Sequence, residues 1–399
     1  MDKMIPGIKN DILCAVKEHL NIDLKSPRIT EIGDGNINRV FRVEDDETDC
    51  PPIVVKYVPE SAVILPTIIL SRDRGRREGK YLLLASEYAK GMVPKVYFYD
   101  EKRYMLFIED LGNVHTLSEA LTDGDFESFD AEKMAGFTAD TCFPTSVYSQ
   151  TRAAQAFDGD FDFHDLCNLT KELVFEQPYY SHENNHFSKE NASFIEKNIY
   201  SNYPLKQRAE ELKNDFLNNH EAVIHGDLHA ASVFSIDKKN VVFDGEFTYC
   251  GPIAFDLGNV LAHLLMTYFR WKVISFTKKV DEDFEIILKK AFEYLELFQK
   301  RFLKLLSDGG KKDIDDEAVV MKIKNDSYSY AGIECIRRVV GLAKAPVFTK
   351  NLSEQQRAAA ERCIVLAGSE LMMKKSAFNS FEKLLDFCET IFTEGIEMN

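Results

Sequence analysis

Three acidic residues in the middle of the chain have the types and spacing for metal-dependent group transfer. Asp227 lies in the string His-Gly-Asp-Leu-His, and Asp244 and Glu246 follow it, directly after an apolar run. Transfer of a phosphoryl group needs one carboxylate beside the attacking hydroxyl and another that holds the metal ion bridging the phosphates. Aspartate is also common in turns, but the two strings together are more specific than either aspartate alone. They predict two acidic centres at the ends of adjacent short strands, facing one cleft.

A glycine-containing loop lies nearer the N-terminus. Residues 33–38 read Gly-Asp-Gly-Asn-Ile-Asn between two strand-like runs, and glycine lets backbone amides approach a phosphate closely. Such a turn also closes any hairpin, but Lys56 on the following strand favours phosphate binding. Glu78 on the next helix is either a partner of Lys56 or part of a solvated charged face. The residues predicted to bind a nucleotide here are Gly33, Asp34, Gly35, Asn36, Asn38 and Lys56.

Two further segments carry candidate ligands. Glu109, Asp110 and Leu111 lie where the strand-rich part ends, and extended backbone there can offer a carbonyl and an amide to an adenine edge. An ordinary linker would have the same side chains. Arg337 and Arg338 are adjacent in a helical run, so their side chains point about 100° apart. From the residues alone, Arg337 borders the apolar stripe with its stem packed there, and Arg338 faces solvent.

The elements that must position these residues change character near residue 112. Before it, the patterns predict an antiparallel sheet with one helix laid on it: strands at 28–32, 39–43, 53–58, 95–99 and 104–108, and a helix at 72–85. After it, helical patterns cover 115–122, 129–156, 165–175, 189–217, 256–279, 283–306, 317–344, 354–374 and 377–392, and a lone β-hairpin lies within 222–247. The sequence therefore predicts an α+β fold with a small nucleotide-binding domain, 1–111, and a large helical domain for catalysis and substrate binding, 112–399.

The composition restricts the class of partner. The formal net charge of the 399 residues is −16, which disfavours binding to duplex nucleic acid. The most apolar stretch, 251–269, contains Asp256 and His263 and is too polar for a membrane span, and the N-terminus lacks the apolar core of a secretory signal. Eight scattered cysteines, and His182 and His186, lack metal-ligand spacing. We expect a cytoplasmic protein without a nucleic-acid partner, a membrane partner or a structural metal.

These motifs resemble those of the small-molecule kinases with the protein-kinase-like fold, which include aminoglycoside, choline and homoserine kinases. Within that superfamily, the chain resembles the methylthioribose kinase (S-methyl-5-thioribose kinase) family. The matching strings are Glu31-Ile32-Gly33-Asp34-Gly35-Asn36-Ile37-Asn38, Val54-Val55-Lys56, Glu109-Asp110-Leu111, Leu173-Val174-Phe175, His225-Gly226-Asp227-Leu228-His229, Gly251-Pro252-Ile253-Ala254-Phe255-Asp256 and Arg337-Arg338. The resemblance implies a bilobal fold, ATP and Mg²⁺, and transfer of the γ-phosphoryl group to the 1-hydroxyl of 5-methylthioribose in methionine salvage.

The resemblance also implies a role for each candidate residue. Asp227 orients the anomeric hydroxyl and accepts its proton, while Arg337 and Arg338 approach the sugar and the transferring phosphate. Asp244 and Glu246 hold Mg²⁺. Lys56 binds the α- and β-phosphates, and the other nucleotide contacts come from the glycine loop, Gly245, Glu109, Asp110 and Leu111. His225 is expected to order the catalytic loop, and His229 is expected to be structural.

The chain departs from the family pattern at three places. Gly245 stands where the family usually has proline in an Asp-Pro-Glu string, Ala230-Ala231 stands where it has Thr-Gly, and Leu65 stands where it commonly has tryptophan before a proline. Both acidic metal ligands are kept, so the metal chemistry is unaffected. The missing tryptophan changes the expected packing near the sugar.

Other readings stay open beside this one. A kinase of the same fold could act on choline, homoserine or an aminoglycoside, but a cationic substrate calls for an acidic or aromatic pocket, and Arg337 and Arg338 argue against that. A catalytically inactive scaffold usually lacks the loop aspartate or the metal ligand, whereas Asp227, Asp244 and Lys56 are all present. Family members are often dimeric, so a homodimer is open too.

Overall fold

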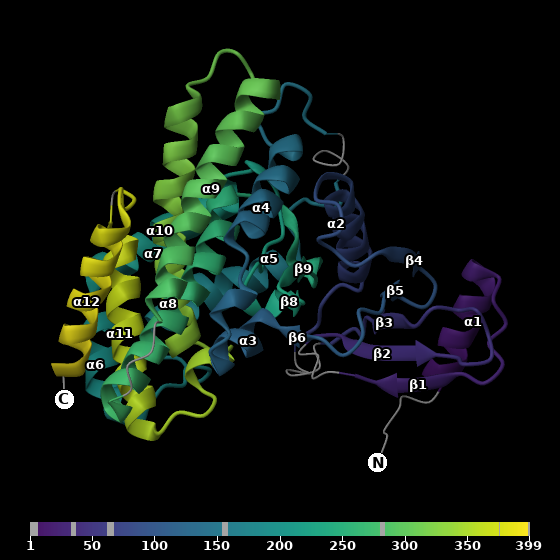
Figure 1. Cartoon of the computed structure of the whole chain (residues 1–399), viewed down its shortest axis with the longest axis horizontal. Helices are drawn as coiled ribbons and strands as arrows, with labels where there is room; N and C mark the ends of the chain where they lie inside the picture. Colours follow the sequence, from purple (N-terminus) through teal and green to yellow (C-terminus); the bar gives the residue numbers. More distant parts are fainter. Residues whose placement is uncertain are drawn as a thin grey trace. The chain divides into compact units, whose positions relative to one another are not determined.

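The computed structural model describes residues 7–32, 37–61, 68–153, 159–279, 284–374 and 376–397. The chain forms two compact units, which are described separately (Figure 1). The first unit comprises Met1–Val114 together with the short segment Phe243–Thr248, and the second comprises His115–Val242 and Tyr249–Asn399. The predicted domain boundary after residue 111 stays a prediction.

A five-stranded antiparallel sheet forms the centre of the first unit. Its strands are β1 (Arg28–Glu31), β2 (Arg39–Glu44), β3 (Ile53–Tyr57), β4 (Val96–Asp100) and β5 (Met105–Glu109), in the order β1-β2-β3-β5-β4. Val55 on β3 pairs with Phe41 on β2 and Phe107 on β5, and all three are buried. Since side chains alternate along a strand, Lys56 points to the opposite face from Val55.

Two helices complete the first unit. The apolar side of α1 (Ile8–Leu20) packs on the buried face of the sheet through the side chains of Ile8, Ile12 and Val16. The second helix, α2 (Arg74–Tyr88), packs against β4 and β5 and against the turn Gly245–Phe247. The predicted sheet with a helix laid on it is confirmed, and α2 is the helix that brings Glu78 to the sheet.

The second unit is mainly helical. Its longest helices are α8 (Ile253–Lys278), α9 (Glu285–Gly309), α10 (Asp316–Val340), α11 (Glu354–Met373) and α12 (Phe381–Glu397). Helices α8 and α11 both pack on α10 (Figure 1). The α8 contact is close because Gly258 has no side chain: a Cβ there would lie 2.8 Å from the backbone nitrogen of Ala331 on α10. This close contact fixes how α8 and α10 face each other. The α+β fold class predicted from the sequence is confirmed.

Shorter helices fill the rest of the second unit, and two predicted helices were too long. The shorter helices are α3 (Leu117–Asp123), α4 (Ala131–Thr145), α5 (Asp165–Thr170), α6 (Ala192–Ile195) and α7 (Tyr203–Asn218). The helix predicted at 129–156 ends at Thr145, whose carbonyl accepts a hydrogen bond from Arg152 instead of a continuing helical amide. The helix predicted at 189–217 is divided, because the side chain of Asn202 caps a new helix and Pro204 lies in its first turn.

The hairpin predicted within 222–247 is formed by two antiparallel strands joined by a turn, but it is not alone, because further strands pair around it. β7 (Ala222–Ile224) pairs with β10 (Tyr249–Gly251), while β6 (His115–Thr116), β8 (Val233–Ile236) and β9 (Lys239–Val242) form a separate sheet. Asp227 follows β7 and Asp244 follows β9, so these residues do not end adjacent strands, and that prediction was wrong. The reason is the loop after β7, where Gly226 has a φ of 82° and a 3₁₀ turn at Ala230–Ser232 directs β8 away from β7.

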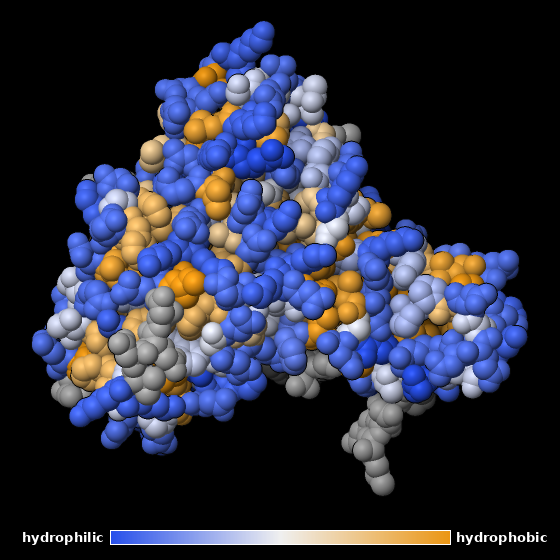
Figure 2. All heavy atoms as spheres, viewed as in Figure 1, coloured by the Kyte–Doolittle hydropathy of each residue, from blue (hydrophilic) through white to orange (hydrophobic). Residues whose placement is uncertain are grey.

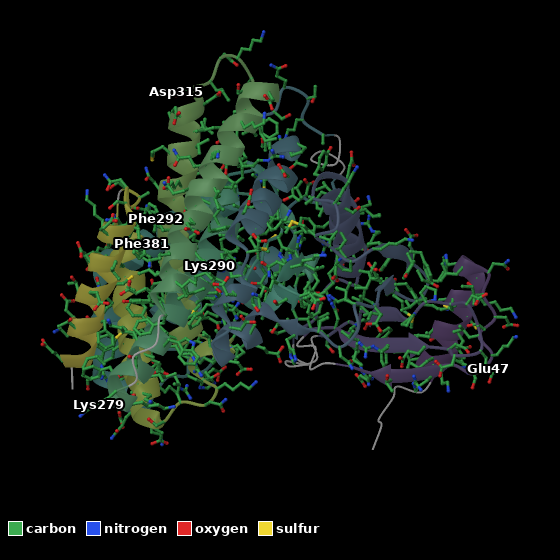
Figure 3. All side chains as sticks on the ribbon, in the orientation of Figure 1. Glu47, Lys279, Lys290, Phe292, Asp315 and Phe381 are labelled. Atoms are coloured by element: carbon green, nitrogen blue, oxygen red, sulfur yellow. The ribbon has the colours of Figure 1, made fainter. Side chains whose placement is uncertain are left out.

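Polar side chains predominate on the face drawn in Figure 2, and they also cap helix ends. On the face drawn in Figure 2, apolar residues are scattered among hydrophilic ones. Asp315, labelled in Figure 3, caps α10 by accepting a hydrogen bond from the backbone nitrogen of Ala318 at 3.1 Å. Throughout the described ranges, each helix is too short or too polar to cross a membrane.

Candidate active site

A buried lysine in the first unit lies among carboxylates. Lys56 on β3 is 6% exposed, and its Nζ lies 2.7 Å from Oε1 of Glu78 on α2 and also contacts Oδ1 of Asp244. The sequence left open whether Glu78 pairs with Lys56 or faces solvent, and the structure shows the pair. Two of the predicted nucleotide ligands, Lys56 and Asp244, are therefore in direct contact.

Glu246 belongs to the same cluster and is held by Asn38. Its Oε2 accepts a hydrogen bond from Asn38 Nδ2 at 2.7 Å and lies 3.7 Å from Arg74 Nε. Arg74 in turn donates from Nε to Asn38 Oδ1 at 3.1 Å, so both ends of the Asn38 amide are used. Asn38 was predicted as a nucleotide contact, and in this structure it positions a carboxylate.

The chain has glycine between Asp244 and Glu246 for a steric reason. Asp244 has a left-handed backbone conformation with a φ of 67°, and the chain then turns toward α2. A Cβ at Gly245 would lie only 2.5 Å from Cδ1 of the buried Tyr81. A proline at this position would meet the same ring.

The carboxylates described in this cluster outnumber the cations. Among the residues just described, the carboxylates of Glu78, Asp244 and Glu246 face only two cations, Lys56 and Arg74. Burial, reinforced by repulsion from Asp244, raises the pKa of Glu246 to about 8. Burial alone would lower the pKa of Lys56, but Asp244 and Glu78 raise it, so the lysine stays charged.

A divalent cation would fit this donor set. Carboxylate oxygens are the ligands that Mg²⁺ prefers, and with Glu246 ionised the cluster would hold one more negative charge than positive. The side chain of Asp244 is 40% exposed, so that part of the cluster can be reached from solvent. Asp244 and Glu246 are the residues that would hold the ion.

For the other predicted nucleotide contacts, the structure gives little information about nucleotide binding. Gly33, Asp34, Gly35 and Asn36 lie outside the described residues, as does the Leu65-Pro66 pair. The side chain of Asp110 is used locally, since its Oδ2 lies 2.6 Å from Arg42 Nε and its Oδ1 accepts from the backbone nitrogen of Gly112 at 2.9 Å. The backbones of Glu109, Asp110 and Leu111 stay predictions as adenine ligands.

In the second unit, a loop after β7 presents Asp227. The backbone nitrogens of His225 and Gly226 donate to the carboxylate of Asp256, at the start of α8, at 2.7 and 3.0 Å. The backbone nitrogen of Asp227 donates to His225 Nδ1 at 3.3 Å. Burial raises the pKa of Asp256 to about 7, against the effect of the two amides. These contacts fix the loop from both sides, and no role had been predicted for Asp256.

Three side chains surround the Asp227 carboxylate. Arg337 Nη2 lies 3.1 Å from its Oδ1, Arg338 Nη2 lies 3.8 Å from the same oxygen, and His229 Nε2 lies 3.1 Å from its Oδ2. His229 Nδ1 accepts a hydrogen bond from the backbone nitrogen of Ala231, so its ring proton is on Nε2 and points at Asp227. His229 was expected to be structural, and it contacts the predicted catalytic group directly.

These contacts set the charge of Asp227. Burial would raise its pKa, but His229 together with Arg337 and Arg338 holds the pKa of Asp227 well below its usual range. The carboxylate is therefore ionised at neutral pH and is a weak base. Its chemistry is that of an acceptor that orients a hydroxyl group rather than one that removes a proton strongly.

Both arginines are buried, which corrects the expectation that Arg338 faces solvent. Arg337 and Arg338 are 8% and 6% exposed. Both are bound by Glu334, one helical turn earlier on α10: Arg338 Nε donates to its Oε1 at 2.7 Å and Arg337 Nε donates to its Oε2. Arg338 Nη2 is buried and has no hydrogen-bond acceptor among the described residues, so it has capacity for a ligand oxygen.

The sequence reading did not assign two members of this group. Glu334 is fully buried, and its spacing of three and four residues from the arginines was the signal that could have identified it. His263 on α8 lies 3.3 Å from Glu334 Oε1, and its ring stacks on that of His229 with centroids 5.1 Å apart. Burial lowers the pKa of His263 to about 3, so it is neutral. Nothing local in the sequence predicts that stack.

The second unit holds an ordered aspartate beside two arginines, and the first unit holds a lysine–carboxylate cluster. These features identify the protein as an ATP-dependent phosphotransferase of the small-molecule kinase class. The chain is 32% identical over 320 residues to the methylthioribose kinase of Bacillus velezensis, covering 78% of each chain. It is 30% identical over 367 residues to that of Bacillus cereus, covering 90% of this chain and 91% of the other. The chain belongs to the methylthioribose kinase family.

Other comparisons add little. No family model matches the chain. Among solved structures, a choline kinase from Cryptosporidium parvum Iowa II is 14% identical, covers 97% of both chains and has a TM-score of 0.48. A spectinomycin phosphotransferase in complex with ADP and spectinomycin is 11% identical, covers 95% of this chain and 98% of the other, and has a TM-score of 0.46. Likenesses at this level carry no conclusion about function, and the family assignment rests on the sequence relatives.

Proposed function

We propose that this protein transfers the γ-phosphoryl group of Mg·ATP to the 1-hydroxyl of 5-methylthioribose, giving 5-methylthioribose 1-phosphate. Membership of the methylthioribose kinase family supports the substrate. The observation that carries the proposal is the ionised Asp227 with two buried arginines beside it, one of which has an unused donor. The group around Asp227 has no surplus negative charge that would favour a cationic acceptor such as choline or an aminoglycoside.

In the second unit, Asp227 is the group that would contact the acceptor. Its carboxylate would accept a hydrogen bond from the anomeric hydroxyl, orient its oxygen and take its proton as the new bond to phosphorus forms. An anomeric hydroxyl is more acidic than an ordinary alcohol, so a weak base at Asp227 is sufficient. Arg337 and Arg338 would bind the sugar and the charge that spreads over the phosphoryl oxygens during transfer.

In the first unit, the nucleotide and metal would meet the lysine–carboxylate cluster. Lys56, kept in place by Glu78, would bind the α- and β-phosphates. Asp244 and Glu246 would hold Mg²⁺, which supplies charge neutralisation at the phosphates when bound. The remaining proposed nucleotide contacts are Gly33, Asp34, Gly35, Asn36, Asn38, Glu109, Asp110, Leu111 and Gly245.

A substrate screen tests the proposal. Purified protein with Mg·ATP is incubated with 5-methylthioribose, choline, homoserine or kanamycin, and ADP release is followed. We expect 5-methylthioribose to give by far the highest kcat/KM. A clear preference for choline, homoserine or kanamycin would overturn the substrate assignment. If no ADP is released with any of the four compounds, the result would contradict a role as a kinase and favour the inactive scaffold.

We also propose that the protein works in the cytoplasm as a homodimer. All eight cysteines are free thiols, as expected in a reducing compartment. The dimer rests on the family resemblance alone. Sedimentation equilibrium would give about twice the 45.6 kDa mass of the chain for a dimer, and the mass of a single chain would contradict this part of the proposal.

A further inference from the structure

The group around Asp227 is balanced in charge. It contains two carboxylates, Asp227 and Glu334, and two guanidiniums, Arg337 and Arg338. Burial would raise the pKa of Glu334, but the two arginines hold it well below its usual range, so Glu334 is ionised. His263 is neutral, and Nδ1 of His229 accepts a hydrogen bond from the backbone nitrogen of Ala231. The four charges therefore sum to zero before a ligand arrives.

The side chain of Glu334 makes its polar contacts, among the described residues, with the two arginines and His263. It is fully buried, and its spacing of three and four residues along α10 puts it on the same face as both arginines. It binds each guanidinium through Nε, which leaves the Nη atoms turned toward Asp227. Glu334 thus fixes the direction of two cations without occupying the nitrogen atoms nearest to the predicted catalytic carboxylate.

The charge of Glu334 has a consequence for the choice of ligand. Without it, two buried guanidiniums would face Asp227 alone, and the group would carry one net positive charge. In a buried, poorly screened site such a group attracts phosphate and other anions. With Glu334 present, that attraction is reduced, whereas an uncharged sugar hydroxyl can still receive a hydrogen bond from Arg338 Nη2.

We propose that Glu334 is a positioning residue that determines specificity: it directs Arg337 and Arg338 toward Asp227 and balances their charge, so that the site accepts an uncharged sugar and binds free anions weakly. The sugar part of this inference rests on the proposed function. The anion part follows from the contacts of Glu334 and does not depend on which acceptor is used.

The direct test is titration of inorganic phosphate by calorimetry into the full-length protein and its variants, in the absence of nucleotide. In Glu334→Gln the amide has the same shape but no charge, and its NH₂ group cannot accept from an arginine. We expect phosphate affinity to rise at least about tenfold over wild type, because a net positive charge is now buried. Equal phosphate affinity in wild type and Glu334→Gln would overturn the proposal.

A matched control is Glu361→Gln on α11. Glu361 is also fully buried and accepts from Arg357 Nε at 2.9 Å and from the backbone nitrogen of Ser188 at 2.8 Å. Its loss removes a buried carboxylate from an arginine elsewhere in the same unit, so we expect wild-type phosphate affinity. A similar rise in both variants would show that the effect is not specific to Glu334 and would overturn the assignment.

Two further variants keep the proposal testable if Glu334→Gln unfolds. Asp227→Asn removes the other negative charge of the group, so it should also raise phosphate affinity; unchanged affinity there would contradict the charge balance. Glu334→Asp keeps the charge but shortens the reach to the arginines. We expect wild-type phosphate affinity in this variant together with a lower kcat, a split that a purely structural role would not produce.

The result can be separated from the fate of the proposed function. If 5-methylthioribose is not phosphorylated but Glu334→Gln binds phosphate more tightly, the sugar assignment fails and the charge-balancing role stands. If the sugar is phosphorylated and phosphate affinity is the same in all variants, the proposed function stands and the role of Glu334 is refuted.

Discussion

The first unit holds a group with more carboxylates than cations, whereas the second holds a group in which carboxylates and guanidiniums are equal in number. In the first, Lys56 and Arg74 face three carboxylates, and burial raises the pKa of Glu246 to about 8. In the second, Asp227 and Glu334 are each paired with arginines. Buried charge is tolerated only when it is compensated, so a bound cation would stabilise the ionised form of the first group, whereas the second group is already balanced.

This difference assigns different kinds of ligand to the two units. The first group matches a triphosphate that arrives with its divalent metal, because the metal would balance the charge of Glu246 in its ionised form. The second group matches a neutral acceptor, because its charges already cancel. Variants that alter one group should therefore change nucleotide binding, and variants that alter the other should change the chemical step and the use of the acceptor.

The largest effect is expected from removing a metal ligand. Asp244→Ala should abolish measurable turnover and weaken Mg·ATP binding, because the cluster loses the carboxylate that is accessible to the ion. Calorimetric titration with Mg·ATP measures this, with Asp46→Ala as a control, since Asp46 is an exposed aspartate of the same unit. Wild-type Mg·ATP affinity in Asp244→Ala would contradict the metal-binding role.

The next largest effect is expected at the catalytic loop. Asp227→Asn should lower kcat by about 10² to 10⁴, the usual range for loss of a positioned proton acceptor, while Mg·ATP affinity stays close to that of wild type. Steady-state kinetics and nucleotide titration on the same preparation give both values, and a thermal melt checks folding. A near wild-type kcat would show that Asp227 does not act on the acceptor.

A smaller and mixed effect is expected from the arginines. Arg338→Ala should raise the KM for the sugar and lower kcat, each by about tenfold, since an arginine can stabilise both bound substrate and transition state. Arg357→Ala is a matched control, because Arg357 pairs with a buried glutamate away from Asp227. Unchanged KM and kcat in Arg338→Ala would remove the arginine from the proposed site.

The smallest effect is on stability, at His263. Burial lowers its pKa to about 3 in the folded protein, against an ordinary value of 6.5. A histidine with a depressed pKa stabilises the fold above pH 6.5, and this contribution is lost as the pH falls. Between pH 6.5 and 4.5, the free energy of unfolding of wild type should therefore fall more steeply than that of His263→Gln. The difference between the two slopes should be up to about 1.4 kcal/mol per pH unit. Urea unfolding at several pH values measures this slope, and parallel curves for the two proteins would refute a buried neutral His263.

Much of the fold could be predicted because its signals are local. Alternating apolar residues predicted the strands of the first unit, and α2 and the long helices of the second unit followed from their apolar periodicity. The pairing of β7 with β10 was missed, since these strands are separated by more than twenty residues and nothing in either short strand specifies its partner. The ends of α4 and α7 depended on hydrogen bonds from Arg152 and Asn202.

Only part of the candidate site could be predicted, because only some of its residues have a signal that is local in the sequence. Short strings identified Asp227, Asp244, Lys56 and the two arginines, because their spacing along the chain is informative. The burial of Arg338 could not be read from helical periodicity, since it depends on α8 and α11 packing on α10. The stack of His229 on His263 requires a loop and a helix to meet, and no pattern along the chain describes that contact.

The central claim is that the phosphoryl group is transferred to the 1-hydroxyl of 5-methylthioribose, and phosphorus NMR of the reaction product tests it most directly. The protein is incubated with Mg·ATP and 5-methylthioribose carrying ¹³C at carbon 1. We predict a single new phosphate ester resonance that is coupled to carbon 1. A product that carries phosphate on another hydroxyl, or no product from folded protein that binds Mg·ATP, would contradict the claim.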